Sequence, residues 1–416
     1  MSLHVAIAGP IATADVLKHL AAAPRKLPIG HPGASILGVL IDELLAMGMK
    51  VSAFTLSEEV PSSRDESLVV DGPSFRMHYC RARRRAWRPN GLLPGRALDL
   101  FLYERRELSR AMRAAGPDAI HAHWCYEYAD AALSTGLPTL VTCHDAPQVV
   151  ARIMKSPYRW LRYLLARRVL AKAGHLTTVS PYMAEQLRPL TGLPIAVVPN
   201  PLGRSVIARS LPRSAPMTRR IAVVSNGWHR LKNQASAVRA FHRFHKTQPC
   251  AELHLFGADL GVNGRAQKWC ERLGLATGVV FHGAIPREGL LDALTEMDVL
   301  VHPSIEESFG MAVAEAMALG LPVVAGNASG AVPWVLGRDH NSPAAELLCD
   351  VRDELAINAM MTQAFDARYK ARSDAGRTEA TTRFHFRAVT EQYLRIYRSL
   401  VRLKSSEGSQ AITLAE

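Results

Sequence analysis

Two glutamates stand eight residues apart in the stretch 303–322, on either side of an expected helix start. Glu307 lies in a polar turn after an apolar strand, and Glu315 lies inside the helix that follows. Carboxylates accept paired hydrogen bonds from vicinal hydroxyl groups, and a helix N-terminus offers unpaired N–H groups to phosphate. With Ser308 as the expected N-cap and Gly310 leaving room for an anion, the stretch predicts a site for a phosphorylated, hydroxyl-rich ligand.

The composition of the expected helix supports a role for Glu315. Residues 312–318 are apolar at every position except 315, which marks the helix as buried. A buried carboxylate without a partner is costly, so we expect Glu315 to have a ligand or a partner. Considered singly, each acid could instead be a solvated turn or surface residue.

A basic pair follows the first strand of the C-terminal half. Arg230 and Lys232 precede a helix expected from Gln234, and Gly227 lies in the same turn. Arg offers a planar fork and Lys a mobile point charge, so the pair could hold a pyrophosphate. The sequence has no Walker-type phosphate loop and no GxGxxG after either first strand, which disfavours ATPases and NAD enzymes. A solvated basic pair is the alternative.

Glycine and histidine mark comparable positions in the N-terminal half. Gly33 precedes an expected helix and would let a ligand approach the backbone closely. His144 follows the expected strand 139–143, and His121 and His123 occupy the same kind of position at the end of the preceding strand. A lone histidine there is usually structural, but three at neighbouring strand ends favour a site.

The order of the expected elements predicts an α/β fold. Apolar strand patterns alternate with helical ones along all 416 residues, which is typical of parallel sheets wrapped by helices. That length suits two domains, and ligands of such sheets bind beyond the carboxyl ends of the strands, which predicts a cleft between the domains. Strands are expected at 3–8, 50–56, 75–80, 119–121, 139–143, 176–179, 196–198, 220–225, 252–256, 279–282, 299–301, 322–325 and 347–349.

A stretch rich in proline and glycine, 201–218, separates the two halves as an expected linker. The predicted organisation is two Rossmann-like, doubly wound domains at 1–205 and 206–383. A terminal helix follows at 384–403, and 404–416 is expected to be a flexible tail.

The net charge of +13 is unevenly distributed. Ten arginines fall between Arg81 and Arg113 against three acids, and a second basic stretch with aromatic residues runs from 155 to 172. Such segments suit an anionic lipid surface or an anionic substrate. A solvated arginine-rich surface is the alternative, and nucleic acid is a weaker one because no binding motif accompanies the charge.

The sequence favours a cytoplasmic protein. The N-terminus enters a strand pattern at once, and no long uncharged run occurs, so neither a signal peptide nor a membrane span is expected. The six cysteines are scattered without metal-like spacing and are expected to be reduced. The basic segments leave open a peripheral position on the inner face of the membrane.

Together these features resemble the retaining glycosyltransferases of the GT-B fold, in glycosyltransferase family 4. The sharpest element is the Glu-x7-Glu motif, here Glu307 to Glu315. The resemblance implies that Glu307 binds hydroxyls of the donor sugar and that Glu315 binds the nucleotide ribose. It also implies that sugar and phosphate meet the backbone amides of Phe309, Gly310, Met311 and Ala312.

The remaining candidates follow from the same resemblance. Arg230 and Lys232 match the basic pair that holds the donor diphosphate, beside Gly227, and Gly33 matches a glycine loop near it. His144 matches a histidine beside the transferred sugar, and the terminal helix matches one that returns to the N-terminal domain. Two departures stand out: Trp334 replaces a glutamate common in the family, and the spacing from Arg230 to Lys232 is tighter than usual.

The predicted function is therefore retaining transfer of a sugar from a nucleoside diphosphate to a glycan, lipid-linked or small-molecule acceptor, in bacterial-type glycan or glycolipid synthesis. The resemblance implies no cofactor and no metal, because basic residues and a helix N-terminus would stabilise the leaving phosphate. The alternatives are a GT-B-like nucleotide-sugar epimerase or phosphorylase, and a non-catalytic protein that binds a membrane surface. The donor base, the sugar and the acceptor are left open.

Overall fold

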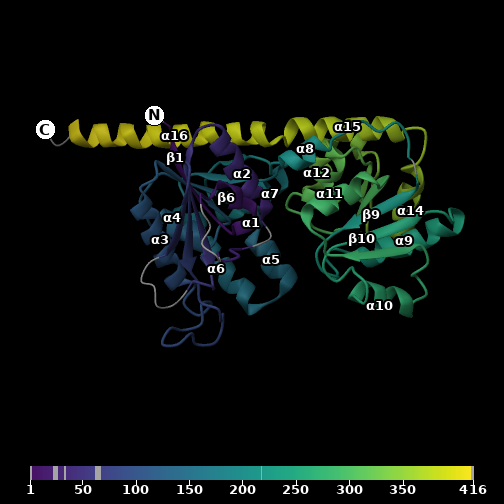
Figure 1. Cartoon of the computed structure of the whole chain (residues 1–416), viewed down its shortest axis with the longest axis horizontal. Helices are drawn as coiled ribbons and strands as arrows, with labels where there is room; N and C mark the ends of the chain where they lie inside the picture. Colours follow the sequence, from purple (N-terminus) through teal and green to yellow (C-terminus); the bar gives the residue numbers. More distant parts are fainter. Residues whose placement is uncertain (1, 22–26, 32–33, 61–66, 217, 414–416) are drawn as a thin grey trace. The chain divides into compact units, whose positions relative to one another are not determined.

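The computed structural model describes residues 2–21, 27–31, 34–60, 67–216 and 218–413, with side chains as far as Leu403. The chain forms two compact units, one of residues 1–201 with 386–416 and the other of residues 202–385. Each unit is an α/β structure built on a largely parallel sheet (Figure 1). The expected fold class of two doubly wound domains is confirmed.

Unit 1 contains a sheet of eight described strands in the order β3-β4-β2-β1-β5-β6-β7-β8. Neighbours pair in parallel except at β3, which runs antiparallel to β4 at the edge. The strands are β1 His4–Ala8, β2 Lys50–Ser57, β3 Leu68–Gly72, β4 Phe75–Arg81, β5 Ala119–His123, β6 Thr139–Cys143, β7 Leu176–Thr178 and β8 Ile195–Val197.

The helices of unit 1 connect these strands, and the terminal helix joins them from the far end of the chain. The helices are α1 Thr13–Val16, α2 Ser35–Ala46, α3 Leu102–Ala115, α4 Glu127–Leu133, α5 Pro147–Met154, α6 Pro157–Lys172, α7 Pro181–Leu187 and α16 Phe386–Thr413, with short 3-10 helices η1 Leu17–His19 and η2 Arg188–Leu190. Side chains of α2 and α16, such as Leu40 and Tyr397, share one buried core with β1 and β2. Burial of this apolar surface is what holds α16 against the sheet.

Unit 2 contains a sheet of six described strands in the order β11-β10-β9-β12-β13-β14. The strands are β9 Arg220–Val224, β10 Glu252–Phe256, β11 Val279–Gly283, β12 Val299–His302, β13 Val323–Gly326 and β14 Leu348–Cys349. The helices are α8 Arg204–Ala208, α9 Gln234–Thr247, α10 Arg265–Arg272, α11 Arg287–Thr295, α12 Met311–Ala318, α13 Val332–Val335, α14 Glu354–Gln363 and α15 Tyr369–Arg383, with 3-10 helices η3 Arg338–His340 and η4 Pro343–Ala345.

Three local expectations differ from the structure. Strand β3 was not expected, because it is a short edge strand that ends in Asp71 and Gly72. The expected linker 201–218 contains helix α8, and Arg213 anchors this stretch to unit 2 by donating to the carbonyl oxygens of Met297 and Leu319, at 2.6 and 2.9 Å.

The third difference concerns the expected tail at 404–416. The expected terminal helix ends at residue 403, whereas helix α16 continues to Thr413. Gly408 falls within this extension, and one interior glycine weakens a helix by about 1 kcal/mol without ending it. Within the described residues, none of the helices combines the length and apolar character needed to cross a bilayer.

Candidate functional site

The sheet of unit 2 reverses its winding between β9 and β12, which are neighbours in space but distant in sequence. Loops after two such strands diverge and leave a crevice where doubly wound sheets bind ligands. The loop after β9 holds Lys232 and the loop after β12 holds Glu307. A hydrogen bond from the N–H of Ile305 to the carbonyl oxygen of Leu231, 2.9 Å long, ties the two loops together.

Lys232 and Glu307 form an ion pair at this crevice. A third group, His302 at the end of β12, places its Nε2 atom 3.2 Å from Oε1 of Glu307. Burial would raise the pKa of Glu307, but His302 and Lys232 outweigh it and hold the pKa at about 2. Glu307 is therefore a charged acceptor at neutral pH, suited to ligand hydroxyl groups.

Helix α12 begins directly after the Glu307 turn, and Gly310 is its N-cap. The expectation that Ser308 is the N-cap is wrong, because the N-cap position is Gly310. Gly310 has φ +97°, a conformation that residues with a Cβ rarely adopt. The amides of the first turn, including Met311 and Ala312, have no acceptor within the helix and could meet an anion.

Glu315 has the partner that its burial demanded. It is buried on α12 and accepts a hydrogen bond of 2.7 Å from Nη2 of Arg287, the first residue of α11. Burial raises the pKa of Glu315, and Arg287 opposes this shift. Arg287 was missed from the sequence, where its only signal is a helix start soon after a strand.

Phe309 and Trp334 explain one departure from the family pattern. The Phe309 ring is buried, edge-on to Phe384 at 5.1 Å and to Trp334 at 6.4 Å between ring centroids. The guanidinium of Arg383 lies 4.6 Å from the centre of the Trp334 ring. The tryptophan thus joins an apolar cluster beneath the Glu307 turn, and the backbone amide of Phe309 is the group that could face a ligand.

Gly227 and Arg230 complete the loop after β9. Gly227 has φ +81°, its N–H donates to Ala258, and its carbonyl oxygen accepts from Gln234. Because its N–H and carbonyl groups are both hydrogen-bonded within the protein, Gly227 can contribute space for a ligand but no backbone hydrogen bond to it. Arg230 is exposed, two residues before Lys232.

The expected histidine cluster lies in unit 1, whose sheet reverses its winding between β1 and β5. His144 follows β6, and its Nε2 lies 2.9 Å from Nδ1 of His123 at the end of β5. The ring of Trp124 packs at 4.3 Å from that of His144. Burial lowers the pKa of His144 to about 3, so this imidazole is neutral at physiological pH.

His121 has a different environment from the other two histidines. Its ring nitrogens lie 2.6 Å from the hydroxyl of Tyr397 on α16 and 2.6 Å from that of Thr142. Both nitrogens are therefore satisfied inside the core, and His121 ties the terminal helix to the sheet. His144 and His123 therefore form one hydrogen-bonded pair, and His121 has a structural role in the core beside them.

A cavity of about 750 Å³ lies at the carboxyl ends of the strands of unit 1. Asp145, next to His144, accepts hydrogen bonds of 3.1 Å from the hydroxyl of Tyr126, and burial raises its pKa. Arg162 pairs with Glu127 at 2.9 Å and covers the ring of Tyr126 at 3.9 Å. Aromatic rings beside carboxylates suit a ligand with hydroxyl groups and apolar faces.

The expected glycine of this half, Gly33, lies outside the described residues. Gly30 lines the cavity instead, with φ +75°. A Cβ at Gly30 would lie 2.4 Å from the carbonyl oxygen of Ile11, so no larger residue fits there.

Two family models match the chain. Residues 34–201 match "Glycosyl transferase 4-like domain" and residues 212–379 match "Glycosyl transferases group 1". The chain is 27% identical over 390 residues to the D-inositol 3-phosphate glycosyltransferase of Paenarthrobacter aurescens, covering 85% of this chain and 90% of that protein. It is 28% identical over 283 residues to the MMP alpha-(1->4)-mannosyltransferase of Mycolicibacterium hassiacum, covering 64% and 66% of the two chains.

Solved structures show the same fold at lower identity. The sucrose-phosphate synthase of Thermosynechococcus elongatus superposes with a TM-score of 0.69 at 20% identity, covering 96% of this chain and 100% of that one. HepE of Anabaena in complex with UDP superposes with a TM-score of 0.62 at 15% identity, over 96% and 100% of the two chains.

Proposed function

The chain belongs to the glycosyltransferases of the GT-B fold, and we propose that it transfers a sugar from a nucleoside diphosphate to an acceptor with retention of anomeric configuration. The observation that carries this proposal is the pairing of Lys232 with Glu307 at the winding reversal of unit 2. A cation, a carboxylate and a helix N-terminus meet there. A nucleotide-sugar needs all three, for its phosphates and for its hydroxyl groups.

The donor is proposed to bind in unit 2. Lys232, with Arg230 at the edge of the loop, would hold the diphosphate, and the first amides of α12 would take the remaining phosphate oxygens. Glu307 would accept from hydroxyls of the sugar. Glu315 would accept from the ribose while retaining Arg287 as its charge partner.

In the reaction, the bond between the anomeric carbon and the phosphate oxygen breaks, so negative charge builds on the leaving phosphate. Lys232 and the N-terminus of α12 would stabilise that charge electrostatically, which is the basis for proposing a reaction without a metal. The leaving phosphate would then take the proton of the acceptor hydroxyl as it attacks the same face of the sugar. Because the leaving phosphate accepts this proton and the acceptor attacks directly, the reaction needs no nucleophilic side chain.

Unit 1 is proposed to supply the acceptor site. The cavity beside Asp145 and Tyr126 offers hydrogen-bond acceptors together with aromatic surface. His144 would orient the transferred sugar through a neutral imidazole, because its low pKa rules out a charged form near pH 7. Relatives that are named for D-inositol 3-phosphate and for mannosyl transfer support a polyol or sugar hydroxyl as the accepting group, whether the acceptor is free or lipid-linked.

The proposal is tested first by thermal shift with UDP-, GDP- and ADP-sugars, and then by analysis of products from the sugar that stabilises the protein. We expect one nucleotide to raise the melting temperature and the product to keep the donor's anomeric configuration by NMR. Activity that persists in a chelator would support the metal-free reaction. Stabilisation by none of the nucleotides would overturn the transferase proposal, and an epimerised free nucleotide-sugar as the product would favour an epimerase.

A further inference from the structure

The two basic and aromatic segments of unit 1 form one continuous surface. The ring of Tyr158, in the first turn of α6, contacts Trp87 at 6.5 Å and Phe101 at 6.3 Å, and both belong to the loop between β4 and α3. Residues 82–102 and 152–168 together are called the basic-aromatic surface here. In Figure 1, α5 and α6 lie on the opposite side of unit 1 from α16.

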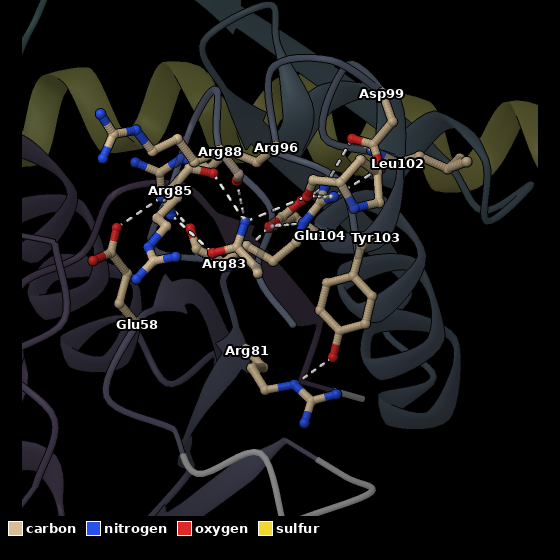
Figure 2. A network of polar contacts seen from close by, with 12 residues as sticks. Glu58, Arg81, Arg83, Arg85, Arg88, Arg96, Asp99, Leu102, Tyr103 and Glu104 are labelled. Carbon is tan, nitrogen blue, oxygen red and sulfur yellow. Dashed lines mark hydrogen bonds and ion pairs between the residues drawn. The ribbon is translucent and has the colours of Figure 1, made fainter. Parts of the chain in front are cut away.

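The base of this loop is fixed by ion pairs (Figure 2). Arg83 is buried and donates to Asp99 at 2.8 Å and to Glu104 at 2.6 Å, while Arg96 donates to Glu58 at 2.7 Å. The expectation that this segment offers its arginines to an external anion is therefore wrong for Arg83, which is neutralised within the protein. The same network makes the loop a defined structural element.

The tip of the loop is held in a tight turn. Asn90 and Leu93 exchange backbone hydrogen bonds of 2.8 and 3.3 Å across Gly91 and Leu92. Gly91 has φ +66°, which a glycine adopts readily. Leu92 is fully exposed at this turn. A rigid turn that presents an exposed leucine is suited to insertion into an apolar medium.

Exposed apolar side chains concentrate on the basic-aromatic surface. Of the seventeen large apolar side chains that are exposed in the described residues, nine lie in 87–102 and 153–164. On α6, Trp160 and Leu164 lie one turn apart and are each about half exposed. Single exposed apolar residues are normal on any protein, but a cluster of them marks an interaction site.

Cations surround these apolar residues. Residues 146–184 contain seven lysines and arginines and no acid. Several of the cations on the surface have no carboxylate partner among the residues that the structure describes: Arg84, Arg88, Arg152, Lys155 and Arg167. An uncompensated positive rim around apolar side chains is complementary to an anionic bilayer, whose headgroups attract the rim while its acyl region receives the apolar groups.

We propose that the basic-aromatic surface docks unit 1 on an anionic membrane and that the acceptor is lipid-linked. Tyr158 and Arg159 belong to this surface and also line the cavity that holds Asp145. A headgroup could therefore enter the cavity while its lipid stays in the bilayer. The acceptor assignment rests on the proposed function, whereas the docking surface does not.

Nucleic acid would use the same cations but not the same apolar groups. Phosphate recognition has no use for the exposed aliphatic side chains of Leu92 and Leu164, whereas insertion into a bilayer does. The exposed aromatic residue Trp160 suits a membrane interface, where its ring sits at headgroup depth.

Vesicle co-sedimentation of the full chain tests the docking surface. We expect binding to vesicles of equimolar phosphatidylglycerol and phosphatidylcholine at low salt, and weak binding to pure phosphatidylcholine. The double variant Arg84→Gln/Arg88→Gln should lower the partition coefficient about thirtyfold. The double variant Leu92→Ser/Trp160→Ser should lower it at least about tenfold, also at higher salt.

A matched control removes the same charge from the other side of unit 1. Arg395 and Arg398 are exposed on α16, so Arg395→Gln/Arg398→Gln should leave vesicle binding nearly unchanged. An equal loss in this control would overturn the proposed surface, because binding would then depend on net charge alone. Failure of the wild-type chain to bind anionic vesicles, or binding only to an RNA or DNA oligonucleotide, would overturn it as well.

The outcomes separate this inference from the proposed function. Nucleotide stabilisation without vesicle binding would reject the docking surface and leave the transferase intact. Vesicle binding without nucleotide stabilisation would reject the transferase and leave the docking surface. If the protein both binds vesicles and is stabilised by a nucleotide, the acceptor class is tested with an acceptor from a lipid extract. Faster glycosylation of this acceptor on anionic vesicles than in detergent would support a lipid-linked acceptor, and equal rates would contradict it.

Discussion

Lys232 donates to Glu307 across a separation of 75 residues, between the loops that follow β9 and β12. Each side chain is less than one quarter exposed, so the pair is largely shielded from water but retains some accessible surface. A phosphate ligand would compete with Glu307 for Lys232 and would leave the carboxylate to the sugar hydroxyls. The pair therefore contributes both to the stability of the fold and to the proposed binding of the donor.

Breaking this pair should affect both properties. We expect Lys232→Ala and Glu307→Ala each to lower kcat by about 100-fold or more, because each removes a group that faces the reacting donor. Each should also cost about 1–3 kcal/mol of unfolding free energy, because one partner is left charged and largely buried. Activity assays and urea unfolding measure the two effects.

The double variant Lys232→Ala/Glu307→Ala provides the control. It should recover part of the lost stability, since no lone charge remains, but none of the activity. Additive stability losses would show that the two side chains do not interact in solution.

Arg287 and Glu315 should govern nucleotide affinity. Glu315→Gln keeps the size of the side chain but removes a charged acceptor, so we expect nucleotide binding to weaken by about 10–100-fold. Arg287→Ala should mainly destabilise the fold, because it leaves Glu315 buried without its partner. Isothermal titration with the nucleoside diphosphate, beside urea unfolding, distinguishes these effects. Unchanged affinity in Glu315→Gln would remove Glu315 from the donor site.

His123 should act as a positioning residue for His144. His123→Leu removes the hydrogen bond to Nε2 of His144 and should lower kcat by about tenfold, with little change in the affinity for nucleotide. His144→Gln should have an equal or larger effect on kcat. As a contrast, His121→Leu should lower the melting temperature, because the hydroxyl of Tyr397 loses its partner and Thr142 keeps its bond to Thr177 but loses the one to His121, while kcat stays near the wild-type value.

Acid should destabilise the protein through buried neutral histidines. His78 stacks on Phe54 at 4.4 Å, and burial lowers its pKa from 6.5 to about 4. The unfolded chain therefore binds a proton at a pH where the folded chain does not. Stability is at its full value above pH 6.5 and falls as the pH is lowered from 6.5 toward 4.

The variant His78→Phe removes this titrating group and retains the ring stack. Between pH 7.5 and pH 5 it should lose about 2 kcal/mol less unfolding free energy than the wild type. Urea unfolding at the two pH values measures the difference. An equal pH dependence in both proteins would show that His78 is protonated in the folded state.

The main features of the proposed donor site could be predicted from local sequence patterns. Each of these features lies within one continuous segment: the turn at Glu307, the helix that carries Glu315 and the basic loop that ends at Lys232. The apolar periodicity of these segments predicts their strand-turn-helix order. The same patterns located most strands within one or two residues. They missed β3, a five-residue edge strand in which only Val70 is buried.

Contacts between distant segments could not be predicted in this way. Arg287 approaches Glu315 only because β11 and β12 end at the same edge of the sheet. The tryptophan at position 334, where the family often has a glutamate, packs beside the rings of Phe309 and Phe384, which are distant from it in the sequence.

The sequence by itself determined the fold class and the residue types of the proposed donor site, because periodicity and turn chemistry are local properties. Only the tertiary structure decided which charges remain available to a ligand. It neutralised Arg83, paired Lys232 with Glu307 and gathered exposed apolar groups around Tyr158. Pairing and burial depend on which segments the sheets bring together, and that order is set by long-range packing.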